Sequence, residues 1–258
     1  MSDFMSVFAD LVGSIADLLE PVFHGSAMAA AIVLFTACVR LLVHPLSRAS
    51  ARGQKARAKL SPQIAELRKK HSKNPEKLQK AVLELHRAEK VSPLSGCLPS
   101  LFQLPAFFLL YHLFSNSSIG GEANALLGHK LFEAPLGGRW ADALADGGVF
   151  GAQGLVYLGL FAIVAAVATF NFRRTKKQMA MAAPVAGGSD AQQVPGMGAI
   201  TKVMPFMSFM TLFTVAFVPL AAALYVVTST TWSAVERAVL YRDMPYGAAG
   251  AGALATAG

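Results

Sequence analysis

The feature that most constrains this chain is an apolar run that carries one arginine inside it. Residues 27–46 read AMAAAIVLFTACVRLLVHPL, long enough to cross a bilayer as a helix. Arg40 lies well inside the run, with no acidic residue beside it. A charge in hydrocarbon costs at least about 2.5–3.5 kcal/mol, so such a residue usually faces a bundle interior or a water-filled cavity. The alternative is that its long side chain reaches the lipid phosphates from near the end of the helix.

The composition predicts an all-α integral membrane protein. Hydrophobic residues make up 54% of the chain and charged residues only 15%, which is more apolar than a soluble domain can conceal. The apolar residues also come in blocks and not in amphipathic stripes. Cys38 and Cys97 both lie in such blocks, so neither a disulfide framework nor a metal site is expected.

Four blocks with few charges predict five transmembrane helices. The last block, residues 203–235, carries no formal charge and as one helix would be about 50 Å long, against a hydrocarbon core of about 30 Å. We therefore expect Pro219 to break it, leaving a short span that thins the bilayer locally. The predicted spans are residues 27–46, 95–115, 149–171, 203–218 and 220–240.

The charges of the connecting segments predict the orientation. Residues 1–26 hold four acids and no Lys or Arg, and residues 115–148 hold two bases and four acids, so both are expected outside. Residues 47–93 carry thirteen Lys or Arg against four Glu, and residues 171–202 carry five against one acid, which places both in the cytoplasm. The N-terminus is then outside. The C-terminus is cytoplasmic and ends in a flexible Ala/Gly-rich tail, residues 242–258.

The segment before the first span, residues 1–26, is predicted to be an amphipathic helix on the outer membrane interface. Its apolar residues recur at helical spacing with acids between them, and Pro21 is expected to end the helix. It lacks the basic region of a secretory signal.

Residues 47–93 are predicted to form a basic helical hairpin in the cytoplasm. Ser61-Pro62 and Asn74-Pro75 each place a capping residue before a proline at the first helical position, with a turn near residues 71–74. A modest apolar stripe in the second arm would face a similar one in the first. Two interpretations stay open: a passive clamp whose charge sets topology and attracts anionic lipid, or a docking arm for a partner.

Three segments together resemble the YidC family of membrane protein insertases. They read VRLLVHPL at the end of the first span, PLSGCLPSLFQLP at residues 93–105, and VPLAAALY ending at Tyr225. The resemblance covers roughly residues 27–241, including the order of the spans and the basic hairpin. It departs from some members, because no large extracytoplasmic domain is seen before the first span and the C-terminal tail is not basic.

The resemblance implies that Arg40 lies in a hydrophilic groove that is open to the cytoplasm and to lipid but closed outside. The positions that would line or border this groove with Arg40 are Thr36, one helical turn earlier, Gln103, Tyr225, Thr228 and Ser229. We expect no acid within the five spans to pair with Arg40. His44 and His112, near membrane ends, are interpreted as interface residues.

The implied function is the insertion of small membrane proteins into the bacterial plasma membrane, alone or beside the secretory translocon, and the folding of larger ones. The partners would be nascent membrane proteins, the lipid bilayer and, in some members, the ribosome. No catalysis, cofactor, metal or nucleotide is expected. A wet groove bearing a cation suits this task on physical grounds too, because it would partly hydrate a polar tail leaving water. The alternative is a small transporter or channel that uses an intramembrane arginine.

The charge balance gives a testable topology. A cysteine placed at Ala123 should react with an impermeant thiol reagent added outside, whereas one at Ala81 should react only from the cytoplasm. Labelling is measured in intact cells and in inverted membrane vesicles. The reverse pattern would contradict the five-span topology.

Overall fold

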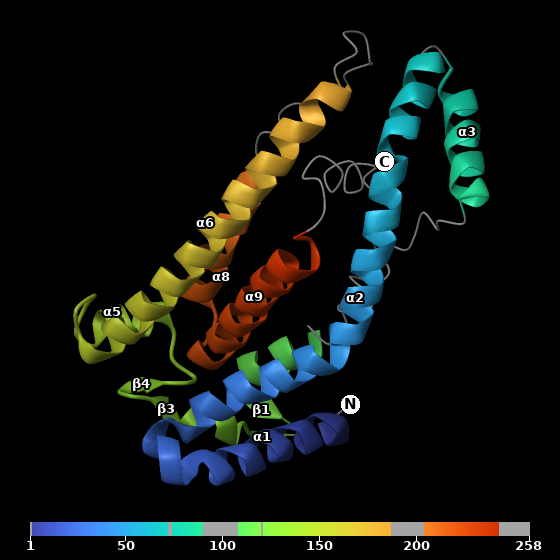
Figure 1. Ribbon diagram of the computed structural model, residues 1–258. Helices are drawn as coiled ribbons and strands as arrows, with labels where there is room; N and C mark the ends of the chain where they lie inside the picture. The colour runs from blue at the N-terminus through green and yellow to red at the C-terminus, as the bar shows by residue number, and fades with distance from the viewer. Residues whose placement is uncertain (1, 72–73, 90–107, 120, 187–203, 243–258) are drawn as a thin grey trace. The chain divides into compact units, whose positions relative to one another are not determined.

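The computed structural model describes residues 2–71, 74–89, 108–119, 121–186 and 204–242, most of them helical (Figure 1). The chain divides into two compact units. Unit 1 comprises residues 1–43, 103–169 and 208–235, and unit 2 comprises residues 44–102, 170–207 and 236–258. The helices α2 (Ala27–Lys70), α6 (Ala152–Ala186) and α9 (Leu220–Leu240) each contribute residues to both units.

The predicted N-terminal helix is present as α1, Ser2–Phe23. The expected end at Pro21 is wrong, because the helix continues to Phe23 with the proline inside its last turn. It ends where His24 adopts a φ of 47°. A residue in this left-handed region directs the chain away from the helix axis, which is a common way for a helix to end.

The side chains of α1 fall on three faces. One face packs into the core of unit 1 through Val12 and Ala16, both buried, flanked by the partly buried Phe8, Ile15 and Leu19. A second face is apolar and exposed, and its residues are Val7, Leu11, Leu18 and Val22. The acids lie on the third face. Such a helix can touch protein, lipid and water at once, as an interfacial helix must.

The first predicted span begins the long helix α2, Ala27–Lys70. The expected helix start at Ser61-Pro62 is wrong, because α2 runs through both Pro45 and Pro62. An interior proline costs a helix about 3 kcal/mol. Strong helix formers on both sides of Pro62, within residues 54–60 and 63–70, offset that cost.

The second arm of the hairpin is α3, Pro75–Ala88, in unit 2. The prediction for its start is confirmed: the Asn74 side chain accepts a hydrogen bond from the Lys77 backbone N–H at 3.0 Å, with Pro75 at the first helical position. Its apolar stripe is half-buried at Leu78, Val82 and Leu85. Leu60, on the first arm, is buried.

Residues 115–148 form a small folded cap in unit 1, which the sequence did not predict. Two antiparallel ribbons lie in it, β1 (Ser118–Ile119) with β2 (Glu122–Ala123) and β3 (Lys130–Leu131) with β4 (Ala134–Pro135). The 3-10 helix η2, Ala125–Gly128, and the short helix α5, Trp140–Ala145, complete it. Trp140 packs against Tyr157 and Phe161 of α6, with ring centroids 5.7 and 5.2 Å away.

Asn124 holds this cap to the helix before it. Its side-chain amide donates to the backbone carbonyls of Leu113 at 2.8 Å and Asn116 at 2.9 Å, and its oxygen accepts from the Leu126 N–H at 3.2 Å. Leu113 belongs to the last turn of the helix at 108–115. Asn124 therefore satisfies carbonyls that the end of that helix would leave unpaired.

The predicted break at Pro219 is confirmed. The 3-10 helix η3, Met204–Phe209, leads into α8, Met210–Phe217, and α9 runs over Leu220–Leu240. Val218 between them is extended, with ψ of 157°, as the residue before a proline prefers.

The cap satisfies the backbone that this break exposes. The N–H groups of Leu220 and Ala221 donate to the carbonyls of Gly138 and Leu136, both at 2.8 Å. The Gly138 carbonyl also accepts from the Tyr157 hydroxyl at 2.7 Å. Unpaired N–H groups at a helix start are costly away from water. The cap thus makes a helix break inside an apolar segment tolerable.

Most of the third predicted span, residues 149–171, lies in α6, Ala152–Ala186. By length and composition, two helical stretches of the described residues could cross a membrane, Ser6–Lys70 and Ala152–Lys177, and Phe206–Phe217 is a shorter apolar helix. Residues 95–107 of the second predicted span and residues 243–258 of the tail lie outside the described residues. The five-span count therefore stays a prediction.

Asn124→Ala should destabilise unit 1 markedly. The substitution removes three hydrogen bonds at a buried position, and orphaned buried carbonyls cost about 1–3 kcal/mol each. We expect the midpoint of thermal unfolding in detergent to fall by about 5–10 °C. Asn116→Ala is the matched control, because within the described part of the chain the Asn116 side chain bonds only the exposed His112 ring. Equal midpoints for the two variants would contradict the structural role of Asn124.

Candidate functional site

Arg40 contacts α9 at Ser229. The Arg40 Nη2 donates to the Ser229 carbonyl at 3.2 Å and to the Ser229 hydroxyl. The same carbonyl accepts from the Ser233 hydroxyl at 2.9 Å. Ser229 therefore accepts hydrogen bonds from two side chains, Arg40 and Ser233. The structure therefore brings together two predicted site residues that are 189 positions apart in the chain.

Tyr225 and Thr36 lie beside this contact, and both are buried. The Tyr225 hydroxyl is hydrogen-bonded to the Ser229 side chain and lies within electrostatic reach of Arg40. Its ring packs against Phe114, with centroids 6.1 Å apart. Thr36 is 1% exposed and its hydroxyl donates to the Ile32 carbonyl of its own helix at 2.7 Å. The Thr36 hydroxyl thus already has a hydrogen-bond acceptor within α2.

The remaining predicted site residues are less informative. Thr228 is half-buried next to Ser229, and Gln103 lies outside the described residues. Just beyond Ser229, the Thr231 hydroxyl and the Trp232 indole N–H are buried without a hydrogen-bond partner among the described residues. Buried polar atoms in proteins are ordinarily paired, often with water. This stretch of α9 therefore has unmet hydrogen-bonding capacity next to the arginine contact.

An ion pair between His44 and Glu236 was not anticipated. The expectation that no acid lies within the spans was wrong, because Glu236 lies inside α9. Its carboxylate meets the His44 Nδ1 at 2.6 Å, with the glutamate side chain 12% exposed and the histidine 36%. His44 thus has a specific partner where only an interface residue was expected. An acid and a histidine near the same ends of two predicted spans were the available signal.

Tyr241 extends the contacts of α9 in unit 2. Its hydroxyl lies close to the side chain of Ser50 on α2, and the Arg174 guanidinium of α6 lies over its ring, 5.9 Å from the centroid. Burial raises the pKa of this phenol above its ordinary value of 10, although the nearby Arg237 opposes the shift. Tyr241 therefore stays neutral and able to hydrogen-bond at physiological pH.

These pairs also give the direction of the helices in unit 2. His44 meets Glu236, and six residues later Ser50 meets Tyr241. The contacts advance along both helices together, so α2 and α9 run in the same direction there. The contacts described at this site are hydrogen bonds and the His44–Glu236 ion pair. In the part of the chain that the structure describes, no group of His, Cys, Asp and Glu could hold a metal.

Comparison with known proteins identifies a family whose members resemble this chain. The profile of the 60Kd inner membrane protein family matches residues 19–247. A relative named membrane protein insertase YidC from Clostridium perfringens is 38% identical over 113 residues, which cover 43% of this chain and 47% of the relative. Another relative of that name, from Magnetococcus marinus, is 39% identical over 103 residues, which cover 40% of this chain and 18% of the relative. A third, from Anaeromyxobacter, is 44% identical over 81 residues, which cover 31% of this chain and 15% of the relative.

The matches to these curated relatives thus span less than half of each relative's length. The family profile nevertheless covers most of the chain, including α2, α9 and the Arg40 contact. A mostly helical fold and apolar helices long enough to span a membrane agree with an integral protein of the plasma membrane. The chain belongs to the 60Kd inner membrane protein family, the YidC/Oxa1 family of membrane protein insertases.

Proposed function

We propose that this protein inserts membrane proteins without enzymatic catalysis, through a hydrophilic groove built around Arg40. In this proposal the hydrophobic segment of a nascent protein enters lipid beside the groove, while its short polar tail passes along it. The observation that carries the proposal is the contact of Arg40, inside an apolar helix, with Ser229 of α9. Family membership supports the same conclusion.

The Arg40 contact suits a site for polar tails. Ser229 supplies neutral oxygens, which orient the guanidinium and add no opposing charge of their own. The acid nearest in sequence along α9, Glu236, is already engaged by His44. A cation in a low-dielectric site attracts an acidic tail more strongly than one in water. Unmet hydrogen-bonding groups at Thr231 and Trp232 support a hydrated surrounding.

Three features support the proposed orientation and mechanism. Parallel contacts of α2 and α9 agree with an odd number of spans, which puts the two termini on opposite sides. The exposed apolar face of α1 suits a helix lying on the outer interface. The helix α8 is short, and Met210, Phe213 and Phe217 on it are exposed. A short span with an apolar surface favours thin surrounding lipid, which lowers the barrier to a passing tail.

The free energy for insertion would come from the substrate itself. Moving its apolar segment into lipid releases roughly 25 cal/mol per Å² of apolar surface removed from water. The groove then has only to lower the cost of the polar tail, dividing one large desolvation into smaller steps. Nascent membrane proteins are the proposed partners. The secretory translocon and the ribosome are further proposed partners, with the basic hairpin as the surface that would meet them.

Insertion by the purified full chain in liposomes tests this function. Substrates are two short single-span proteins that differ only in an acidic or a neutral translocated tail. Wild-type protein should insert both, measured by protease protection of the tail. Arg40→Ala should slow the acidic-tailed substrate by at least about tenfold, the loss expected from removing about 1.4 kcal/mol of charge attraction. Arg40→Lys should keep much of the rate, because it keeps the charge.

The neutral-tailed substrate is the internal control and should be slowed less by Arg40→Ala. Unchanged thermal unfolding of both variants shows that the fold is intact. If Arg40→Ala slowed insertion of the acidic-tailed and the neutral-tailed substrate by the same factor relative to wild type, Arg40 would be assigned to contact with lipid phosphates. That result would contradict the proposed groove. Failure of the wild-type protein to insert either substrate, with transport of a solute instead, would favour the channel alternative.

A further inference from the structure

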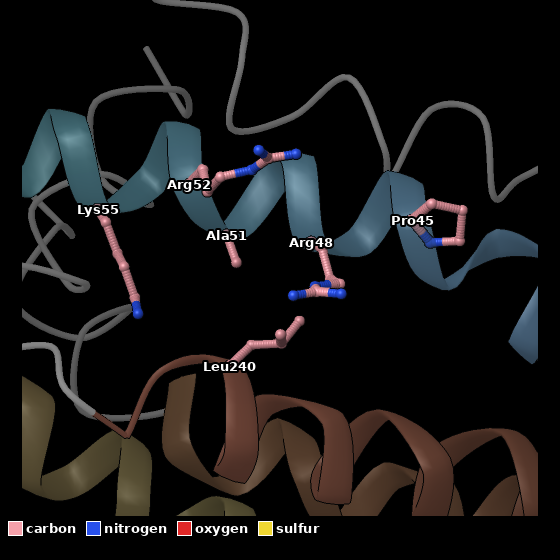
Figure 2. A pocket seen from close by; sticks show the side chains of 6 residues that line it. All are labelled: Pro45, Arg48, Ala51, Arg52, Lys55 and Leu240. Atoms are coloured by element: carbon pink, nitrogen blue, oxygen red, sulfur yellow. The ribbon is translucent and has the colours of Figure 1, made fainter.

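A cavity of about 440 Å³ lies in unit 2 between α2 and the end of α9. Its lining residues are Pro45, Arg48, Ala51, Arg52, Lys55 and Leu240. Figure 2 shows Arg48, Ala51 and Lys55 projecting from α2 toward Leu240 of α9. The volume falls within the range of about 300–1,000 Å³ that is typical of ligand sites. Its lining, among the residues that the structure describes, includes three cations and no acid.

The cations of this cavity occupy neighbouring turns of α2, with Arg48 and Lys55 directed toward Leu240 and Arg52 directed away from it (Figure 2). Arg48, Arg52 and Lys55 follow the i, i+4, i+7 spacing that aligns side chains along a helix. Like charges so arranged repel one another, which destabilises a helix unless an anion lies between them. Among the described residues none of the three forms an ion pair, and the carboxylate of Glu236 is taken by His44. The cavity therefore has concentrated positive charge that no acid of the described chain neutralises.

The position of the cavity points to the source of the anion. Arg48 comes two residues after the apolar run at 27–46, and Leu240 is the last residue of α9. In a membrane-spanning helix, residues at this boundary lie at the level of the lipid headgroups. Pro45 adds apolar surface on the side of the apolar run, where the glycerol and upper acyl chains of a lipid would lie, and Leu240 faces Arg48 and Ala51 across the cavity (Figure 2).

We propose that this cavity binds the phosphate of an anionic phospholipid, held by Arg48 and Lys55 with Arg52 beside them. Guanidinium and ammonium groups form charge-assisted hydrogen bonds to phosphate oxygens, the arginine in a bidentate manner. A headgroup bound here would bridge the two helices that carry the Arg40 contact and the His44–Glu236 pair. The site does not depend on the insertase proposal, because it requires only the contact of α2 with α9 in unit 2.

Lipid binding to the purified full chain tests the site. The protein in neutral detergent is titrated with phosphatidylglycerol, and bound lipid is counted by native mass spectrometry. The double variant Arg48→Gln/Lys55→Gln should raise the dissociation constant of the tightest site by at least about tenfold, since each basic residue near a membrane surface contributes about 1 kcal/mol of attraction to anionic lipid. The charge-preserving Arg48→Lys/Lys55→Arg should stay within about threefold of wild type.

A matched control removes the same charge from the same helix. Arg68→Gln/Lys69→Gln lies at the exposed end of α2, away from the cavity, and should leave the tightest site unchanged. Zwitterionic phosphatidylcholine should bind more weakly than phosphatidylglycerol. Equal loss in the two charge-removing variants would overturn the site in favour of diffuse attraction. Equally tight binding of glycerol phosphate, or displacement of the lipid by an acidic decapeptide at matching concentration, would overturn its assignment to lipid.

Discussion

A guanidinium inside an apolar helix needs polar partners, and in this chain α9 provides them. The contact of Arg40 with Ser229 depends on α9 starting and running where it does. Its start depends on the cap at residues 115–148, whose carbonyls at Leu136 and Gly138 accept the first N–H groups of the helix. The arginine contact and the cap are thus linked through one helix. Loss of either would leave polar groups unsatisfied in an apolar region.

Much of this architecture could be predicted because it follows from local rules. A 33-residue uncharged block is too long for one span, and Pro219 is where it breaks. Asn74 before Pro75 starts a helix because its side chain can accept from the third residue on. Arg40 was singled out as a charge inside an apolar run, and Tyr225 and Ser229 came from the resemblance; the structure brings all three to one place. Their role in a groove remains a proposal.

The features that the sequence did not reveal depend on distant contacts or on competing costs. The cap is built from two-residue ribbons, whose stability comes from packing and from bonds to Leu220 and Ala221 that no local pattern encodes. Pro62 looked like a helix start, yet the helix formers around it keep α2 continuous. The pairing of His44 with Glu236 joins residues 192 apart. Neither residue alone indicates a partner.

The central claim is that water and substrate reach the Arg40 contact from the cytoplasmic side. Thr228, half-buried next to Ser229, is a suitable probe, because no described hydrogen bond depends on its side chain. In a protein whose Cys38 and Cys97 are replaced by serine, Thr228→Cys should react with an impermeant thiol reagent added to the cytoplasmic face. A bound substrate tail should slow that reaction. Labelling from the outer face alone, or no labelling from either face, would contradict a cytoplasm-open hydrophilic groove.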